Sequence, residues 1–81
     1  MIDYVILEDE RFAYEEIKRM INVLRPDYNL KEWADSVERA VSVLAKDMPD
    51  LLIADIRLSD GLCFDVFERK QTHMPVILTT A

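Results

Sequence analysis

Carboxylates and hydroxyls follow three short apolar runs of the chain. Glu8 and Asp9 follow the first run, Asp55 follows the second, and Thr79 and Thr80 follow the third. Several carboxylate oxygens held together are the kind of ligand that a hard divalent ion such as Mg²⁺ prefers. A carboxylate can also attack phosphorus and form an aspartyl phosphate. If these residues meet in space, they suit phosphoryl transfer to Asp55, with a strand-end hydroxyl bonded to a phosphoryl oxygen.

The apolar runs themselves indicate strands that are buried on both faces, as in parallel sheets. They cover residues 4–7, 51–54 and 75–78, and a weaker run of mixed polarity over 28–34 suits an edge strand. Apolar residues at helical spacing between them predict three helices, over about 10–24, about 36–48 and about 62–71.

Local signals refine two of these helices. Asp35 or Ser36 can cap the second helix, with Glu38 placed for a capping-box contact if Asp35 is the cap. Ser59-Asp60-Gly61 is a turn signal before the third helix, on which Cys63, Phe64 and Phe67 are expected to face inward.

Strands and helices therefore alternate along the chain, which predicts an α/β fold with parallel strands and right-handed crossovers. Ligands of such sheets bind at the carboxyl ends of the strands. If the first, third and fourth strands are neighbours, Glu8, Asp9 and Asp55 meet at that edge. Their repulsion would cost on the order of several kcal/mol unless a cation lies among them.

Composition excludes several other classes. The 81 residues allow one domain at most, and 16 acidic against 10 basic side chains argue against direct nucleic-acid binding. The single cysteine, Cys63, rules out an internal disulfide or a thiolate zinc cluster, and the single glycine argues against a glycine-rich phosphate loop. No run is long enough to span a bilayer and the N-terminus lacks a basic region, so we expect a cytoplasmic protein.

Three segments together resemble the receiver domain of bacterial two-component response regulators: residues 4–10, 51–61 and 75–81. The Leu58-Ser59-Asp60-Gly61 turn and the Thr79-Thr80-Ala81 ending look most like receivers of LytTR-type transcription regulators. The resemblance covers the whole chain in order and implies a flavodoxin-like, doubly wound parallel sheet with strand order 2-1-3-4.

The resemblance also implies a role for each matching residue. Asp55 matches the phospho-acceptor, and Glu8 and Asp9 match the acidic pair that holds Mg²⁺. Arg57 matches the position whose backbone carbonyl completes the metal shell, and Thr80 matches the hydroxyl that moves toward the phosphoryl group on activation.

Three features of the sequence qualify the match to the receiver family. Thr79 lies one residue before Thr80 and is expected to face the other side of the strand. Glu8 stands where the family often has Asp. The family's fifth strand, with its lysine and aromatic switch residue, and its last helices lie beyond residue 81, which predicts a truncated receiver domain over 1–81.

Simpler interpretations apply to single residues. Asp9 could merely cap the first helix, Cys63 is expected to be a small core residue, and His73 is expected in a solvated loop. Trp33 is expected to pack in the core under the second helix, with a partner surface as the alternative.

The leading functional hypothesis is a signalling receiver, which a sensor histidine kinase phosphorylates on Asp55 and which controls a DNA-binding output domain outside this chain. It would assist its own phosphorylation without being a turnover enzyme. The alternative is a receiver-like interaction module that is not phosphorylated. A phosphatase with an aspartate nucleophile fits poorly, because Arg57 stands where it needs a second aspartate. We expect either self-association through the apolar strand at 76–78 or that these residues are the ordered part of a longer chain.

Overall fold

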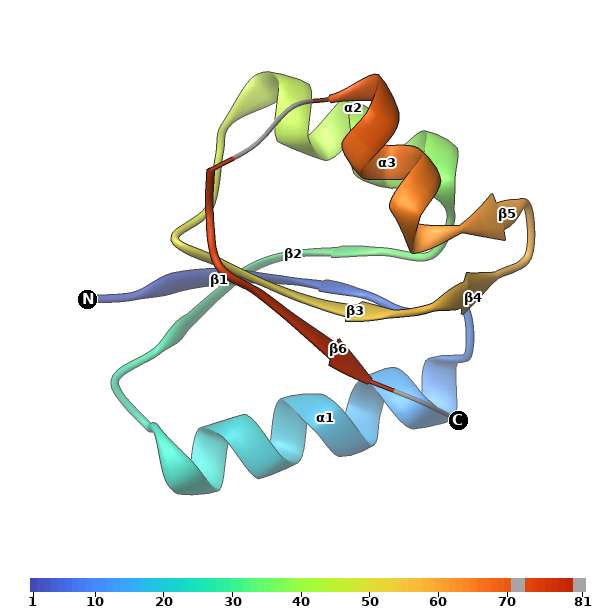
Figure 1. The fold of residues 1–81 in the computed structure, drawn as a ribbon. Helices are drawn as coiled ribbons and strands as arrows, with labels where there is room; N and C mark the ends of the chain where they lie inside the picture. The colour runs from blue at the N-terminus through green and yellow to red at the C-terminus, as the bar shows by residue number, and fades with distance from the viewer. Residues whose placement is uncertain (71–72, 80–81) are drawn as a thin grey trace.

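The computed structural model describes residues 1–70 and 73–79 and places a parallel sheet between helices (Figure 1). The sheet contains β1 (Asp3–Leu7), β2 (Asn29–Ala34), β3 (Leu51–Asp55) and β6 (Val76–Thr79), in the order β2-β1-β3-β6. The helices are α1 (Arg11–Leu24), α2 (Val37–Lys46) and α3 (Cys63–Arg69). Strand β6 is the fourth strand of this sheet along the chain, so the predicted α/β class and the predicted strand order 2-1-3-4 are confirmed.

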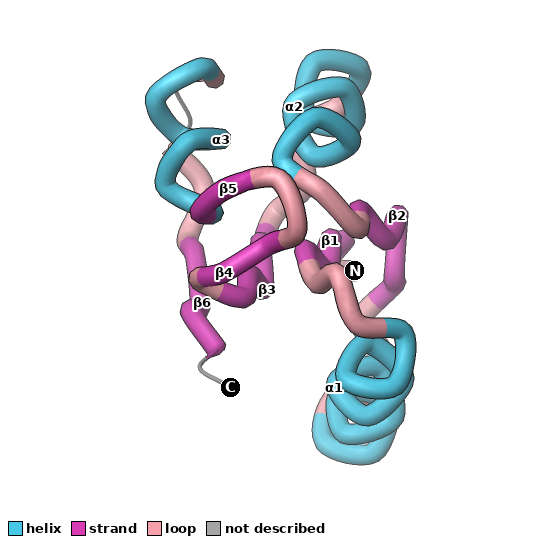
Figure 2. Tube along the Cα trace, turned by 90° about the vertical axis from the view of Figure 1, so that its right-hand side faces the viewer, coloured by secondary structure: helices cyan, strands magenta, loops and turns pink. Residues whose placement is uncertain are grey.

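The helices cover both faces of the sheet, with α1 on one face and α2 and α3 on the other (Figure 2). Side chains alternate along β1, so Val5 and Leu7 pack toward α2 and α3 while Tyr4 and Ile6 pack toward α1. All four are fully buried. An unbroken apolar run is what a strand covered on both faces requires.

The helix ends agree with the sequence in part. Ser36 caps α2, since its hydroxyl accepts a hydrogen bond from the Arg39 N–H at 3.0 Å. Glu38 forms no capping box there and pairs with Arg69 of α3. Helix α3 begins at Cys63, and the predicted end at residue 71 lies outside the described residues.

Three side chains were expected to pack inward, and the structure confirms this only in part. Cys63 is fully buried as expected, but Phe64 is 42% exposed, so its predicted inward orientation was wrong. Trp33 packs in the core as expected, but against Tyr14 of α1 rather than under the second helix.

The segment after Asp55 contains a hairpin that the sequence pattern did not predict. Its strands are β4 (Arg57–Leu58) and β5 (Gly61–Leu62), which pair antiparallel. Gly61 has a φ of +151°, and a Cβ there would lie 2.6 Å from the Asp65 carboxylate. That carboxylate accepts a hydrogen bond from the Leu62 N–H at 2.9 Å, so the hairpin reaches α3 only because residue 61 lacks a side chain.

Substituting Gly61→Ala is therefore expected to lower the free energy of unfolding by about 1–3 kcal/mol, because of backbone strain and the displaced Asp65 carboxylate. Urea denaturation measures the loss. The matched control is Ser59→Ala in the same turn, whose exposed side chain should change stability by less than about 0.5 kcal/mol. Equal stability of the two variants would contradict the role given to Gly61.

Candidate functional site

Three carboxylates meet at the carboxyl edge of the sheet. Glu8 and Asp9 follow directly on β1, and Asp55 is the last residue of the neighbouring strand β3. One ligand oxygen from each lies within 4.8 Å of the other two. Glu8 is 4% exposed and Asp55 is 8% exposed, whereas Asp9 is exposed to solvent. The predicted convergence of these residues is confirmed.

A hollow of about 520 Å³ opens at this edge, between the sheet and α1. Glu8, Asp55 and Thr79 line its sheet side, and α1 contributes Ala13 and Ile17. Glu10 and Glu16 line the hollow as well, so it is strongly acidic, with apolar contacts from α1.

Burial raises the pKa of Glu8 to about 7. The Asp55 charge raises it as well, while a hydrogen bond from the Glu10 N–H at 3.2 Å opposes both effects. Within the described residues, no lysine or arginine forms an ion pair with any of the three carboxylates. A cation entering the site would relieve this repulsion and favour the ionised form of Glu8.

The last two residues of β2 fix the backbone of Glu8. Its N–H donates to the Ala34 carbonyl at 3.0 Å, and its carbonyl accepts from the Trp33 indole Nε1–H at 2.8 Å. The Trp33 ring stacks on Tyr14 of α1, with ring centroids 4.0 Å apart. Sequence reasoning missed this support, although a lone tryptophan near the end of the strand beside β1 is a signal for it.

Thr79, the last residue of β6, lies on a different face of the sheet from the one expected. Thr79 pairs with Asp55 in the β3–β6 register and lines the same hollow, so the prediction that it faces away from the site was wrong. Residues directly opposite in neighbouring strands share a face of the sheet, which explains its position. Its hydroxyl donates to the Ala54 carbonyl at 3.4 Å. Thr80, to which the switch role was assigned, lies outside the described residues.

Arg57 opens the β4–β5 hairpin just beyond Asp55. Its side chain is exposed, so any contribution to a metal site would come from its backbone. The assignment of its carbonyl as a metal ligand stays a prediction.

Known proteins resemble the chain in sequence and in structure, although no family model matches it. The sensory transduction protein LytT of Bacillus anthracis is 31% identical over 80 residues, which are 96% of this chain and 32% of that protein. LytT of Enterococcus faecalis is 37% identical over 70 residues, 86% of this chain and 28% of that protein. The chain therefore spans about a third of the length of these relatives.

Among solved structures, the receiver domain of the response regulator PhyR from Erythrobacter litoralis superposes with a TM-score of 0.84. It is 28% identical, and the match covers 99% of this chain and 63% of that one. The chain is a response-regulator receiver domain. Receiver domains are signalling modules that bind Mg²⁺ at an acidic pocket, and this chain has an acidic cluster of Glu8, Asp9 and Asp55. In the part of the receiver that the structure describes, no helix is long and apolar enough to cross a membrane.

The raised pKa of Glu8 predicts a pH dependence of stability in metal-free buffer. Between about pH 4.5 and about pH 7, Glu8 stays protonated in the folded receiver and ionises in the unfolded chain. The contribution of Glu8 to the free energy of unfolding is full below about pH 4.5 and is lost as the pH rises through about 7. The total loss is at most about 3 kcal/mol.

Denaturation at several pH values, with chelator present, measures this dependence. Glu8→Gln should flatten the decline toward neutral pH, whereas Glu15→Gln, at an exposed position of α1, should leave it unchanged. An unchanged decline in Glu8→Gln would show that other carboxyls cause it.

Proposed function

We propose that this receiver takes a phosphoryl group from a sensor histidine kinase onto Asp55 and thereby switches a DNA-binding output domain. The observation that carries the proposal is the cluster of Glu8, Asp9 and Asp55, two of them buried, at the carboxyl ends of neighbouring strands. Burying two carboxylates together without a cation is unfavourable, and a site for a metal and a phosphoryl group accounts for it.

Mg²⁺ fits the residues present. Carboxylates of Glu8, Asp9 and Asp55, with the backbone carbonyl of Arg57, would hold it, and all of these donors are oxygen. When bound, Mg²⁺ offsets the charge of the carboxylates and of the phosphoryl oxygens. Glu8 also has a longer side chain than the aspartate common at this position, and its fixed backbone limits where its carboxylate can reach.

Asp55 is assigned as the nucleophile, because it ends the strand between β1 and β6. One of its carboxylate oxygens forms a bond to phosphorus while the P–N bond of the kinase phosphohistidine breaks, and the leaving imidazole takes up a proton. Ala13 and Ile17 of α1 would lie beside the acyl phosphate.

A threonine hydroxyl at the end of β6 would then bond a phosphoryl oxygen. The resemblance assigns this role to Thr80, which would carry the change to the rest of the domain. Thr79 already lies beside Asp55 in the hollow, so it is the second hydroxyl to test.

Labelling by a small phosphodonor tests the proposed function. With Mg²⁺ and acetyl phosphate, we expect one phosphoryl group per chain by mass spectrometry, with the label abolished in Asp55→Asn and by chelator. Asp50→Asn, which changes an exposed aspartate at the start of β3, is the matched control and should label normally.

Absence of label in the parent would favour the alternative, an interaction module that is not phosphorylated. Label that persists in Asp55→Asn would place the acceptor elsewhere.

The described edge of the sheet at β6 offers a surface for a second copy. Ile77 is 53% exposed and Leu78 is 44% exposed, and Ile77 borders an apolar hollow with Leu24 and Ile53. Exposed apolar edge strands tend to pair with another chain, so we propose self-association through this region.

Sedimentation velocity on the purified chain should therefore show a concentration-dependent dimer, which Ile77→Lys should weaken. Glu68→Lys, a substitution at an exposed position on α3, controls for the change of charge. A parent chain that stays monomeric at all concentrations would contradict this prediction.

A further inference from the structure

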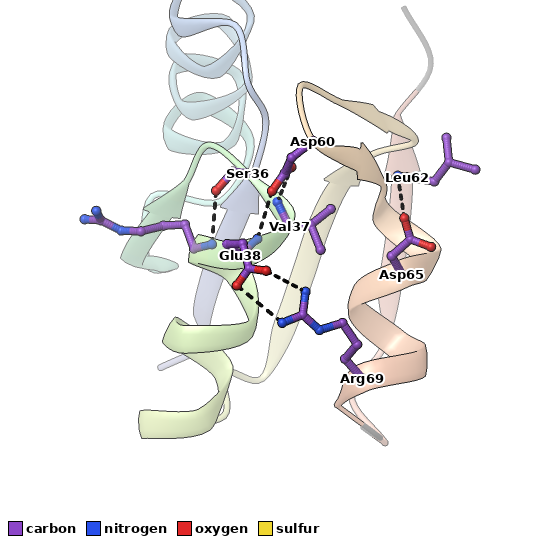
Figure 3. A network of polar contacts seen from close by, with 8 residues as sticks. Ser36, Val37, Glu38, Asp60, Leu62, Asp65 and Arg69 are labelled. Carbon is purple, nitrogen blue, oxygen red and sulfur yellow. Dashed lines mark hydrogen bonds and ion pairs between the residues drawn. The ribbon is translucent and has the colours of Figure 1, made fainter.

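Asp60 links the segment after Asp55 to α2. It lies in the turn between β4 and β5, and its carboxylate accepts hydrogen bonds from the Val37 N–H at 2.7 Å and the Glu38 N–H at 3.2 Å (Figure 3). Both donors belong to the first turn of α2, where backbone N–H groups lack partners within the helix. The carboxylate therefore joins two segments that are distant in the sequence.

Further contacts hold the other side of the same hairpin. The Cys63 N–H donates to the Ile56 carbonyl at 2.9 Å, and Asp65 accepts from the Leu62 N–H. An ion pair with N···O distances of 3.0 and 3.3 Å joins Arg69 of α3 to Glu38 of α2 (Figure 3). This pair is exposed and contributes little energy by itself, so the hairpin depends more on its backbone contacts.

The hairpin carries the backbone of Arg57. Arg57 pairs with Leu62, and the next residue, Leu58, is buried in the core. If Asp60 released α2, the tip of the hairpin would lose its hydrogen bonds to α2, and the hairpin would keep its own ladder and its contacts at the start of α3. Strands β4 and β5 have only two residues each. The direction of the Arg57 carbonyl therefore depends on the contacts that hold the two ends of this hairpin.

We infer that Asp60 is a positioning residue for the acidic site: by holding the β4–β5 hairpin against α2, it fixes the Arg57 carbonyl relative to Asp55. The inference rests on the proposed function, which assigns that carbonyl to the metal. Groups that orient metal ligands without touching the metal typically change metal affinity by about ten- to a hundredfold when they are removed.

The charge of Asp60 suits this task. The hydrogen bond from the Val37 N–H lowers the pKa of its carboxyl, and the Glu38 N–H acts in the same direction. The carboxylate therefore stays ionised at neutral pH, with both oxygens acting as acceptors at the positive end of α2.

Ser36 provides a matched control, because its side chain caps the same helix end through a hydrogen bond within that end rather than to the hairpin. Its hydroxyl accepts from the Arg39 N–H at 3.0 Å. Asp60→Ala and Ser36→Ala each remove acceptors from the α2 N-terminus, and each should lower the melting temperature by a few degrees, on the order of that expected for a lost helix cap. Only Asp60→Ala also removes the hydrogen bonds between the hairpin and α2.

Calorimetric titration with Mg²⁺ alone separates the two roles. We expect Asp60→Ala to raise the Mg²⁺ dissociation constant about tenfold. Ser36→Ala should stay within about twofold of the parent, because the Arg57 backbone keeps its support. Asp60→Asn, which keeps one acceptor oxygen, should lie between Asp60→Ala and the parent.

Equal Mg²⁺ affinity in the parent, Asp60→Ala and Ser36→Ala would reduce Asp60 to a helix cap and overturn the inference. An equal loss in both alanine variants would overturn it too, because damage to α2 would then be the cause. If Asp60→Ala does not fold, Asp60→Asn against Ser36→Ala decides in the same way. A parent that binds no Mg²⁺ would instead overturn the proposed function, and the inference with it.

Discussion

Repulsion between buried carboxylates is the constraint around which this receiver is built. Glu8 follows directly on β1 and Asp55 ends β3, and the parallel arrangement of these neighbouring strands holds their side chains together. The apolar residues of the two strands, packed under helices on both faces, supply the stability against which this local cost is set. The acidic edge therefore lowers stability locally, and a cation bound there would offset that cost.

Different parts of the fold hold the two sides of the acidic edge. On the β1 side, Trp33 and Ala34 of β2 fix the backbone of Glu8. On the β3 side, the hairpin after Asp55 contacts the first turn of α2 through Asp60 and the start of α3 through Leu62. Polar contacts to the backbone on both sides of the site thus orient the acidic side chains.

The sequence predicts features that depend on neighbouring residues better than features that depend on contacts between distant segments. The apolar runs predict the four strands, and their polar ends predict that Glu8, Asp9 and Asp55 meet. The order of the strands in the sheet follows from the resemblance to receiver domains. Strands of two residues have no periodicity, so the β4–β5 hairpin left no signal beyond its turn. The face of the sheet on which Thr79 lies depends on its register with Asp55 in the neighbouring strand. The hydrogen bond from Trp33 to the Glu8 carbonyl depends on the pairing of β2 with β1. Neither pairing can be read from the residues next to Thr79 or Trp33 in the sequence.

Trp33 is the only tryptophan of the chain, and its indole N–H lies 2.8 Å from the carbonyl of Glu8. Indole emission responds to nearby charge and to the strength of its hydrogen bond. Any event that changes the charge at the acidic edge therefore acts on a single native fluorophore, with no background from a second indole within the 81 residues. The receiver thus carries its own optical probe, placed on the edge strand by the same contact that fixes Glu8.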